Sequence, residues 1–274
     1  MTDRYAVLGN PIGHSKSPAI HAAFAAQTRQ DIRYEAILAP LDGFTQAVAA
    51  FAAAGGRGAN VTVPFKEEAH RLATRLSPRA VRAGAVNTLT FSGEGIAGDN
   101  TDGAGLVADI ESNLGFPLAG KRILLLGAGG AARGVVGPLL DTGAGHLTIA
   151  NRTAAKAREL AHLFVHHGNI LGCGLPEIEG PFDAVINATA ASLAGEAVPL
   201  PAGVFGPGAL AYDMMYGQAE TPFLAAARAA GATRLADGLG MLVEQAAEAF
   251  LLWRGIRPET APVLAALRAQ LARA

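Results

Sequence analysis

A short apolar run that ends in a glycine-rich turn constrains this chain more than any other segment. The run Ile123–Leu126 leads directly into Gly127-Ala128-Gly129-Gly130-Ala131-Ala132. This spacing matches G-x-G-x-x-A, in which the glycines allow a tight turn and a close approach to a pyrophosphate, and the small last residue lets helix pack on sheet. A helix that begins here would also present unpaired N–H groups to phosphates. Because the motif lies between a predicted strand and a predicted helix, it indicates a dinucleotide site more than a simple packing turn.

The segment after the next predicted strand carries no carboxylate. That strand is His146–Ala150, and Asn151-Arg152-Thr153 follows it. NAD sites usually have an Asp or Glu here that accepts a hydrogen bond from the ribose 2′-OH. Arg152 instead offers a planar guanidinium suited to a 2′-phosphate, and Lys156 lies one helical turn later. The pattern favours NADP over NAD.

Short β-type runs alternate with helical patterns along the whole chain, which predicts an α/β protein with largely parallel sheets. The second half, from Lys121, reads as a doubly wound β-α-β series. A helix over Asp102–Leu114 would bridge the two halves, and Ser17 is expected to cap a helix that has Pro18 at its first position. Other helices are expected around Phe44–Phe51, Thr153–His166, Leu239–Trp253 and Ala261–Ala274. The predicted strands are Tyr5–Leu8, Arg33–Leu38, Ala59–Val63, a hairpin of Val86–Phe91 with Ile96–Gly98, Arg122–Leu126, His146–Ala150, Asp183–Asn187 and Ala209–Asp213.

Composition excludes several classes of protein. Charged residues make up 16% of the chain, and 22 basic residues balance 23 acidic ones, so a nucleic-acid partner is not expected. No apolar run approaches the roughly 18 residues of a membrane helix, and no signal-peptide core follows Met1. The lone Cys173 fits a reducing compartment. We therefore expect a cytoplasmic protein with no membrane partner.

Polar side chains follow several predicted strands of the first half. Ser15 and Ser17 lie at a strand–helix junction, Lys66 follows Pro64-Phe65, and Asn87 and Asp102 lie in two further polar segments. A partly desolvated lysine can act as an acid or base, although a surface lysine that opens a helix is commoner. Ser17 would also be explained by helix capping alone. No His or Cys spacing points to a metal, so His14 and His21 are interpreted as structural.

Taken together, these segments resemble the shikimate dehydrogenase family, with eight matches in order along nearly the whole chain. The matching segments are Asn10–His21, Gly58–Glu67, Gly84–Leu89, Gly98–Gly105, Leu125–Gly134, Asn151–Thr153, Tyr212–Tyr216 and Asp237–Ala246. The resemblance implies a substrate domain over residues 1–103 and 240–274, and a Rossmann-type NADP domain over residues 104–239, with a cleft between them. It implies the reversible reduction of 3-dehydroshikimate to shikimate by NADPH, a step on the chorismate pathway of aromatic amino-acid biosynthesis.

The resemblance also assigns roles residue by residue. Lys66 matches the family's catalytic lysine and Asp102 its partner aspartate. Ser15, Ser17 and Tyr216 match contacts of the substrate carboxylate, and Thr62, Asn87 and Gln245 match side chains around the ring hydroxyls and the reacting centre. The positions that match the NADP site are Gly127, Ala128, Gly129, Gly130, Ala131, Asn151, Arg152, Thr153, Lys156, Thr189, Met214 and Gly238.

Two departures from the family pattern affect loops on the cofactor side. Ala190-Ala191-Ser192 follows Thr189 where Ser-x-Gly is frequent, and Gly217-Gln218 follows Tyr216 where Asn and Pro are frequent. Three alternatives stay open: a broader quinate/shikimate dehydrogenase that uses NAD or NADP, a non-catalytic NADP-binding sensor, and an interaction protein with an idle glycine turn. The chain is expected to be a monomer or a homodimer.

Overall fold

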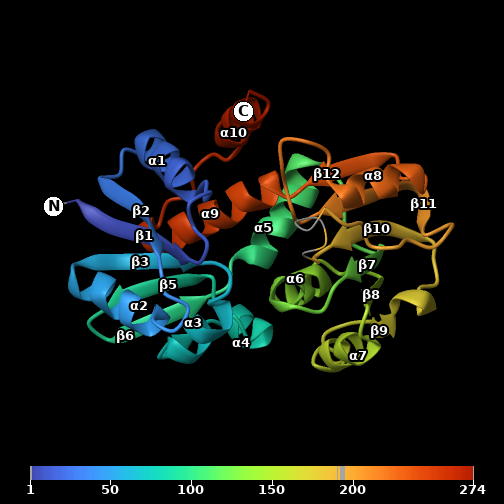
Figure 1. The fold of residues 1–274 in the computed structure, drawn as a ribbon, viewed down its shortest axis with the longest axis horizontal. Coiled ribbons are helices and arrows are strands. Elements are labelled where there is room, and N and C mark those ends of the chain that lie inside the picture. Colours follow the sequence, from blue (N-terminus) through green and yellow to red (C-terminus); the bar gives the residue numbers. More distant parts are fainter. Residues whose placement is uncertain (1, 190, 192–194, 274) are drawn as a thin grey trace.

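The computed structural model describes residues 2–189, 191 and 195–273. Two six-stranded sheets stand side by side, and helices pack on both of them (Figure 1). The predicted α/β class is confirmed. No helix within the described ranges is long and apolar enough to cross a membrane.

The first sheet is mixed and has the strand order β2-β1-β3-β5-β6-β4. Its first three strands in the chain pair in parallel, whereas β5 runs antiparallel to both β3 and β6. The predicted hairpin of β5 and β6 is therefore confirmed. Because β5 runs antiparallel to both of its neighbours, this sheet is less parallel than expected. The strands are β1 (Asp3–Gly9), β2 (Ile32–Leu38), β3 (Gly56–Val61), β4 (Arg75–Leu76), β5 (Thr88–Ser92) and β6 (Gly95–Asp99).

The second sheet is parallel at every described pairing and has the order β12-β11-β10-β7-β8-β9. If its six strands are numbered 1 to 6 in chain order, starting with β7, the order in the sheet is 6-5-4-1-2-3. This is the doubly wound arrangement, in which dinucleotides bind where the strand order reverses. The strands are β7 (Arg122–Leu126), β8 (His146–Asn151), β9 (Ile170–Gly174), β10 (Phe182–Asn187), β11 (Phe205–Asp213) and β12 (Arg234–Asp237). The doubly wound prediction is confirmed.

The helices cover the sheets and join the two halves of the chain. They are α1 (Ser17–Thr28), α2 (Phe44–Ala53), α3 (Lys66–Leu72), α4 (Pro78–Ala83), α5 (Asp102–Ala108), α6 (Gly130–Asp141), α7 (Ala154–His162), α8 (Pro222–Ala229), α9 (Leu239–Arg254) and α10 (Ala261–Leu271). The helix α5 continues as one π-helical turn over Asp109–Asn113. This continuous segment is the bridging helix expected over Asp102–Leu114, and α9 returns beside it to the first half (Figure 1).

Several local expectations were wrong. Ser17 is the first residue of α1 and not its cap, because Lys16 occupies the N-cap position. The helix α7 ends at His162, four residues early. Cys173 lies buried in β9, a strand that was not among those predicted. At Gly172 an added Cβ would lie 2.4 Å from the Ala157 carbonyl oxygen, so this strand uses glycine to let α7 pack closely.

Candidate functional site

A cavity of about 460 Å³ opens where the two halves of the chain meet. Its wall comes from the β1–α1 loop, the ends of β3 and β11, and the helices α3, α5, α6 and α9. All eight residues that the resemblance places around the substrate line it, together with three of the cofactor positions. These are Ser15, Ser17, Thr62, Lys66, Asn87, Asp102, Tyr216 and Gln245, with Ala131, Met214 and Gly238.

Lys66 and Asp102 form an ion pair on this wall. Lys66 begins α3 and Asp102 begins α5, and their Nζ and Oδ2 atoms are 2.6 Å apart although 36 residues separate them in the chain. The side chains are 22% and 8% exposed respectively. The lysine is thus neither a free surface residue nor fully enclosed: its ammonium group faces the cavity from a partly desolvated position.

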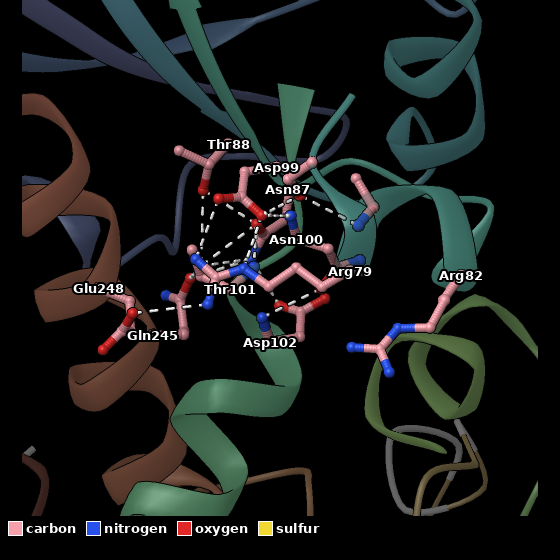
Figure 2. Close-up of polar contacts among 12 residues, drawn as sticks. Arg79, Arg82, Asn87, Thr88, Asp99, Asn100, Thr101, Asp102, Gln245 and Glu248 are labelled. Carbon is pink, nitrogen blue, oxygen red and sulfur yellow. Dashed lines mark hydrogen bonds and ion pairs between the residues drawn. The ribbon is translucent and has the colours of Figure 1, made fainter. Parts of the chain in front are cut away.

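Asn87 links this pair to the neighbouring helices. Its Nδ2 donates to Asp102 Oδ1 at 2.8 Å, to Thr101 Oγ1 at 2.9 Å and, more weakly, to Gln245 Oε1 at 3.3 Å (Figure 2). In return, the backbone N–H of Thr101 donates to Asn87 Oδ1 at 2.8 Å. Asn87 is 2% exposed and Asp102 is 6% exposed, so the contacts lie largely out of water. The carboxylate is held in one orientation by donors on both of its oxygens.

Ser15 and Ser17 lie at the start of α1. The backbone N–H of Ser17 donates to Ser15 Oγ at 3.3 Å, and no side chain in the described part of the chain caps this helix. With both hydroxyls on the cavity wall beside a helix N-terminus, the loop can receive a carboxylate. Tyr216 also lines the cavity. Burial raises the pKa of its phenol, so its hydroxyl is a neutral donor.

The glycine turn has the shape that a pyrophosphate needs. Gly127 adopts φ +109°, and an added Cβ would lie 3.2 Å from the Ala188 carbonyl oxygen. At Gly129 and Gly130, by contrast, an added Cβ would meet no atom of the described residues within 4 Å, so these residues leave the space above the first turn of α6 open. Among the described residues no side chain caps α6, so its first N–H groups are available to an anion.

The predicted 2′-phosphate residues begin at Asn151, the last residue of β8, and continue into α7. Asn151 Nδ2 donates to the Thr153 carbonyl oxygen at 3.0 Å, which closes the turn before α7. Arg152, Thr153 and Lys156 are exposed, and within the described part of the chain neither cation has an ion-pair partner. The segment can therefore present positive charge to a phosphate without breaking an existing contact.

The remaining cofactor positions, Thr189, Met214 and Gly238, lie just after the carboxyl ends of β10, β11 and β12 respectively. An added Cβ at Gly238 would lie 2.2 Å from the Met214 carbonyl oxygen, so glycine is needed for this approach. Thr189 Oγ1 donates to Asn187 Oδ1 at 2.7 Å. Of the first departure from the family pattern, Ala190 and Ser192 lie outside the described residues, whereas Gly217-Gln218 lies in an irregular segment after β11.

Sequence reasoning did not single out four polar residues around the site. Asn60 lines the cavity, and Tyr34, Thr88 and Thr101 lie behind its wall. Asn60 alternates with Thr62, and Thr88 and Thr101 are next to named residues, so alternation and adjacency could have pointed to three of them. Nothing local marks Tyr34, which lies on β2, separated in the sheet by β1 from Asn60 on β3, and reaches Asn60 by a side-chain hydrogen bond.

The two histidines of the first loop and helix have different surroundings. His14 is exposed at the edge of the cavity. His21 is fully buried and stacks on Tyr34 with ring centroids 4.1 Å apart. Burial lowers the pKa of His21 to about 3, so its ring is neutral near neutral pH.

Three family models match the chain. They describe the shikimate dehydrogenase substrate binding domain over residues 7–89, shikimate / quinate 5-dehydrogenase over residues 109–194, and the shikimate 5'-dehydrogenase C-terminal domain over residues 238–268. Together they cover both halves of the fold.

Full-length relatives agree with these matches. Shikimate dehydrogenase (NADP(+)) of Dechloromonas aromatica is 68% identical over 272 residues, which is 99% of each chain. An Ael1 enzyme of Pseudomonas putida has a similar structure, with a TM-score of 0.93 and 51% identity over 97% of this chain and 98% of that one. The Thermus thermophilus shikimate 5-dehydrogenase in complex with NADP(H) and shikimate has a TM-score of 0.87 and 35% identity over 98% of this chain and 99% of that one.

Proposed function

We propose, because this chain belongs to the shikimate dehydrogenase family, that it catalyses the reversible NADPH-dependent reduction of 3-dehydroshikimate to shikimate. This reaction is a step of aromatic amino-acid biosynthesis. The observation that carries the proposal is the Lys66–Asp102 pair, 2.6 Å apart on the wall of a cavity that also contains residues of the nucleotide half.

NADPH, when bound, supplies the hydride that reduces the carbonyl carbon. Gly127–Ala131 would hold its pyrophosphate, because no described side chain covers Gly129 and Gly130 or caps the helix that begins there. Asn151–Thr153 and Lys156 would hold the 2′-phosphoribose. Met214 and Gly238 line the cavity and would flank the nicotinamide, with Thr189 nearby.

Lys66 handles the proton of the reaction. Reduction of the ketone leaves charge on its oxygen, and the Lys66 ammonium would donate a proton to that oxygen. Asp102 accepts a hydrogen bond from the same ammonium and, held by Asn87, would orient both the lysine and a ring hydroxyl. In a variant of this mechanism, Lys66 mainly stabilises the developing negative charge.

The other cavity residues would orient the substrate. Ser15, Ser17 and Tyr216 offer three hydroxyl groups to its carboxylate, while Thr62, Asn87 and Gln245 face its ring hydroxyls and the reacting carbon. A carboxylate held by neutral donors agrees with a chain whose formal net charge is −1. These positioning contacts would place the carbonyl within reach of both hydride and proton.

The proposal includes the organisation of the chain. Residues 1–103 with 240–274 would form the substrate domain and residues 104–239 the NADP domain. Sheet membership supports this division, because the first sheet uses residues up to Asp99 and the second uses Arg122 to Asp237. We also propose that the protein works in the cytoplasm.

The direct test is absorbance at the nicotinamide band with the purified chain, shikimate and NADP. Comparing kcat/KM for shikimate and quinate, each with NADP and NAD, separates the proposed enzyme from a broader quinate/shikimate dehydrogenase. We expect shikimate with NADP to be the best pair, because Arg152 stands where an NAD site has a carboxylate. Absence of turnover with any pair, together with tight NADP binding, would instead indicate a non-catalytic sensor.

A further inference from the structure

We propose that Thr88 and Tyr34 are positioning residues, which orient Asn87 and, through it, the Asp102 carboxylate. The inference rests on the proposed function, because it assigns Asp102 and Lys66 to catalysis. Neither Thr88 nor Tyr34 lines the cavity. They act from behind its wall, through a buried chain of hydrogen bonds that ends on Asp102.

The chain begins at the aromatic ring that stacks on His21. The Tyr34 hydroxyl donates to Asn60 Oδ1 at 2.7 Å, and Asn60 Nδ2 donates to Thr88 Oγ1 at 3.1 Å. Asn60 Nδ2 also donates to the Asn87 carbonyl oxygen at 3.2 Å. Since a carbonyl oxygen can only accept, this contact fixes which end of the Asn60 amide faces Thr88.

The second half of the chain runs through Asn87. The Thr88 hydroxyl donates to Asn87 Oδ1 at 2.9 Å, and Asn87 Nδ2 donates to Asp102 Oδ1 at 2.8 Å (Figure 2). Lys66 Nζ donates to the other carboxylate oxygen at 2.6 Å. Each link of the chain therefore donates in the direction of Asp102.

This direction is fixed by groups that have only one hydrogen-bonding role. The Thr101 backbone N–H can only donate, and it points at Asn87 Oδ1 at 2.8 Å, so Nδ2 must face the carboxylate. The Thr88 hydroxyl next to Oδ1 must then donate, which leaves its oxygen free to accept from Asn60. Hydrogen bonds aligned in one direction polarise and strengthen one another. If the Asn87 amide were flipped, its Nδ2 would face the Thr101 N–H and its Oδ1 would face the Asp102 carboxylate, so the amide is held in one orientation.

Burial makes this alignment important. Asn60, Asn87 and Thr88 are 6%, 2% and 1% exposed, so water cannot readily replace a missing partner. Loss of the Thr88 hydroxyl still leaves one partner on each neighbour, Thr101 N–H for Asn87 and the Asn87 carbonyl for Asn60. The variant Thr88→Val is therefore expected to fold, with an Asn87 amide that is less firmly held.

The test compares three variants on strand β5. Thr88→Val removes the hydroxyl and keeps the branched shape, whereas Thr88→Ser keeps the hydroxyl. Thr90→Val is the matched control, because Thr90 lies two residues along the same strand on the same face but borders a separate pocket, with none of the cavity residues in its lining. We expect Thr88→Val to lower kcat by roughly 10- to 100-fold, the scale of loss for misplaced catalytic groups. The KM for NADPH should stay the same, Thr88→Ser should recover activity to within about threefold, and Thr90→Val should match the parent protein.

Two further readings separate positioning from a structural role. Deuterium at the transferred position of NADPH should give a larger isotope effect on kcat in Thr88→Val, because misplacement slows the chemical step. Tyr34→Phe keeps the stack on His21 and should lower kcat in the same direction, by less. Melting temperatures report whether each variant is folded.

A folded Thr88→Val with parental kcat, or a Thr88→Ser as slow as Thr88→Val, overturns the inference. Inactivity of the parent protein would instead reject the proposed function.

Discussion

Gly105 and Gln245 touch where the two bridging helices cross. A Cβ atom added at Gly105 would lie 2.6 Å from both the backbone nitrogen and the Cβ of Gln245. The helices α5 and α9 thus approach to backbone contact, and this crossing carries Asp102 at the start of α5 and Gln245 on α9 to the same cavity. At this crossing, position 105 has no room for a side chain.

Gly105→Ala is therefore expected to push α9 away from α5. Overpacking of this kind costs about 1–3 kcal/mol of stability, and the displacement of Gln245 should lower kcat as well. Thermal unfolding and steady-state kinetics measure the two effects. Gly93→Ala, in the turn of the β5–β6 hairpin, is the matched control, because an added Cβ there meets nothing within 4 Å. Equal melting temperatures for the two variants would contradict the crowding at α5 and α9.

Arg152→Ala is expected to weaken NADPH binding more than NADH binding. The guanidinium is exposed after β8, and a hydrogen bond to a charged partner is worth about 1.5–3 kcal/mol, so the loss for NADPH should be roughly 10- to 100-fold. Titration of the binding of each cofactor measures this. Arg158→Ala is the control, because Arg158 lies on α7 but is paired with Glu177 at 2.8 Å. An equal loss for both cofactors would show that Arg152 does not contact the 2′-phosphate.

Stability should fall in acid because of His21. Its pKa is lowered by burial from 6.5 to about 3. Below pH 6.5 His21 binds a proton in the unfolded chain but stays neutral in the folded chain. Its contribution to the free energy of unfolding is therefore intact above pH 6.5 and is lost progressively towards pH 3. His21→Phe keeps a ring against Tyr34 and removes the titrating group. Denaturant unfolding between these pH values should show a flatter pH dependence for the variant, and parallel curves would rule out this role for His21.

The fold was predictable wherever sequence and packing make the same demand. The turn at Gly127 lies between a buried strand and a helix, and the structure has the positive φ that such a turn uses. Strand β9 was missed because Gly172 weakens its β pattern, while close packing against Ala157 requires that glycine. Ser17 was misplaced by one position because helix ends are set by hydrogen bonds over the whole first turn, not by the capping residue type alone.

The candidate site was only partly predictable. The resemblance named residues that line the cavity, whereas the residues behind the wall needed the structure. Thr88 lies on β5 and Tyr34 on β2. Both form hydrogen bonds with Asn60 on β3, a strand that lies between them in the sheet. Side-chain contacts between strands that are distant in sequence cannot be predicted from the local pattern of either strand.

Lys66→Ala tests the central claim most directly. Lys121→Ala is the control, because Lys121 is a lysine paired with Asp183 at 3.6 Å and does not line the cavity. Steady-state oxidation of shikimate by NADP is the measurement. The expected result is a fall in kcat by a factor of about 10² or more for Lys66→Ala, the usual loss for a general acid–base group, with Lys121→Ala unchanged. A folded Lys66→Ala protein with near-parental kcat would contradict the assignment of the proton transfer to this lysine.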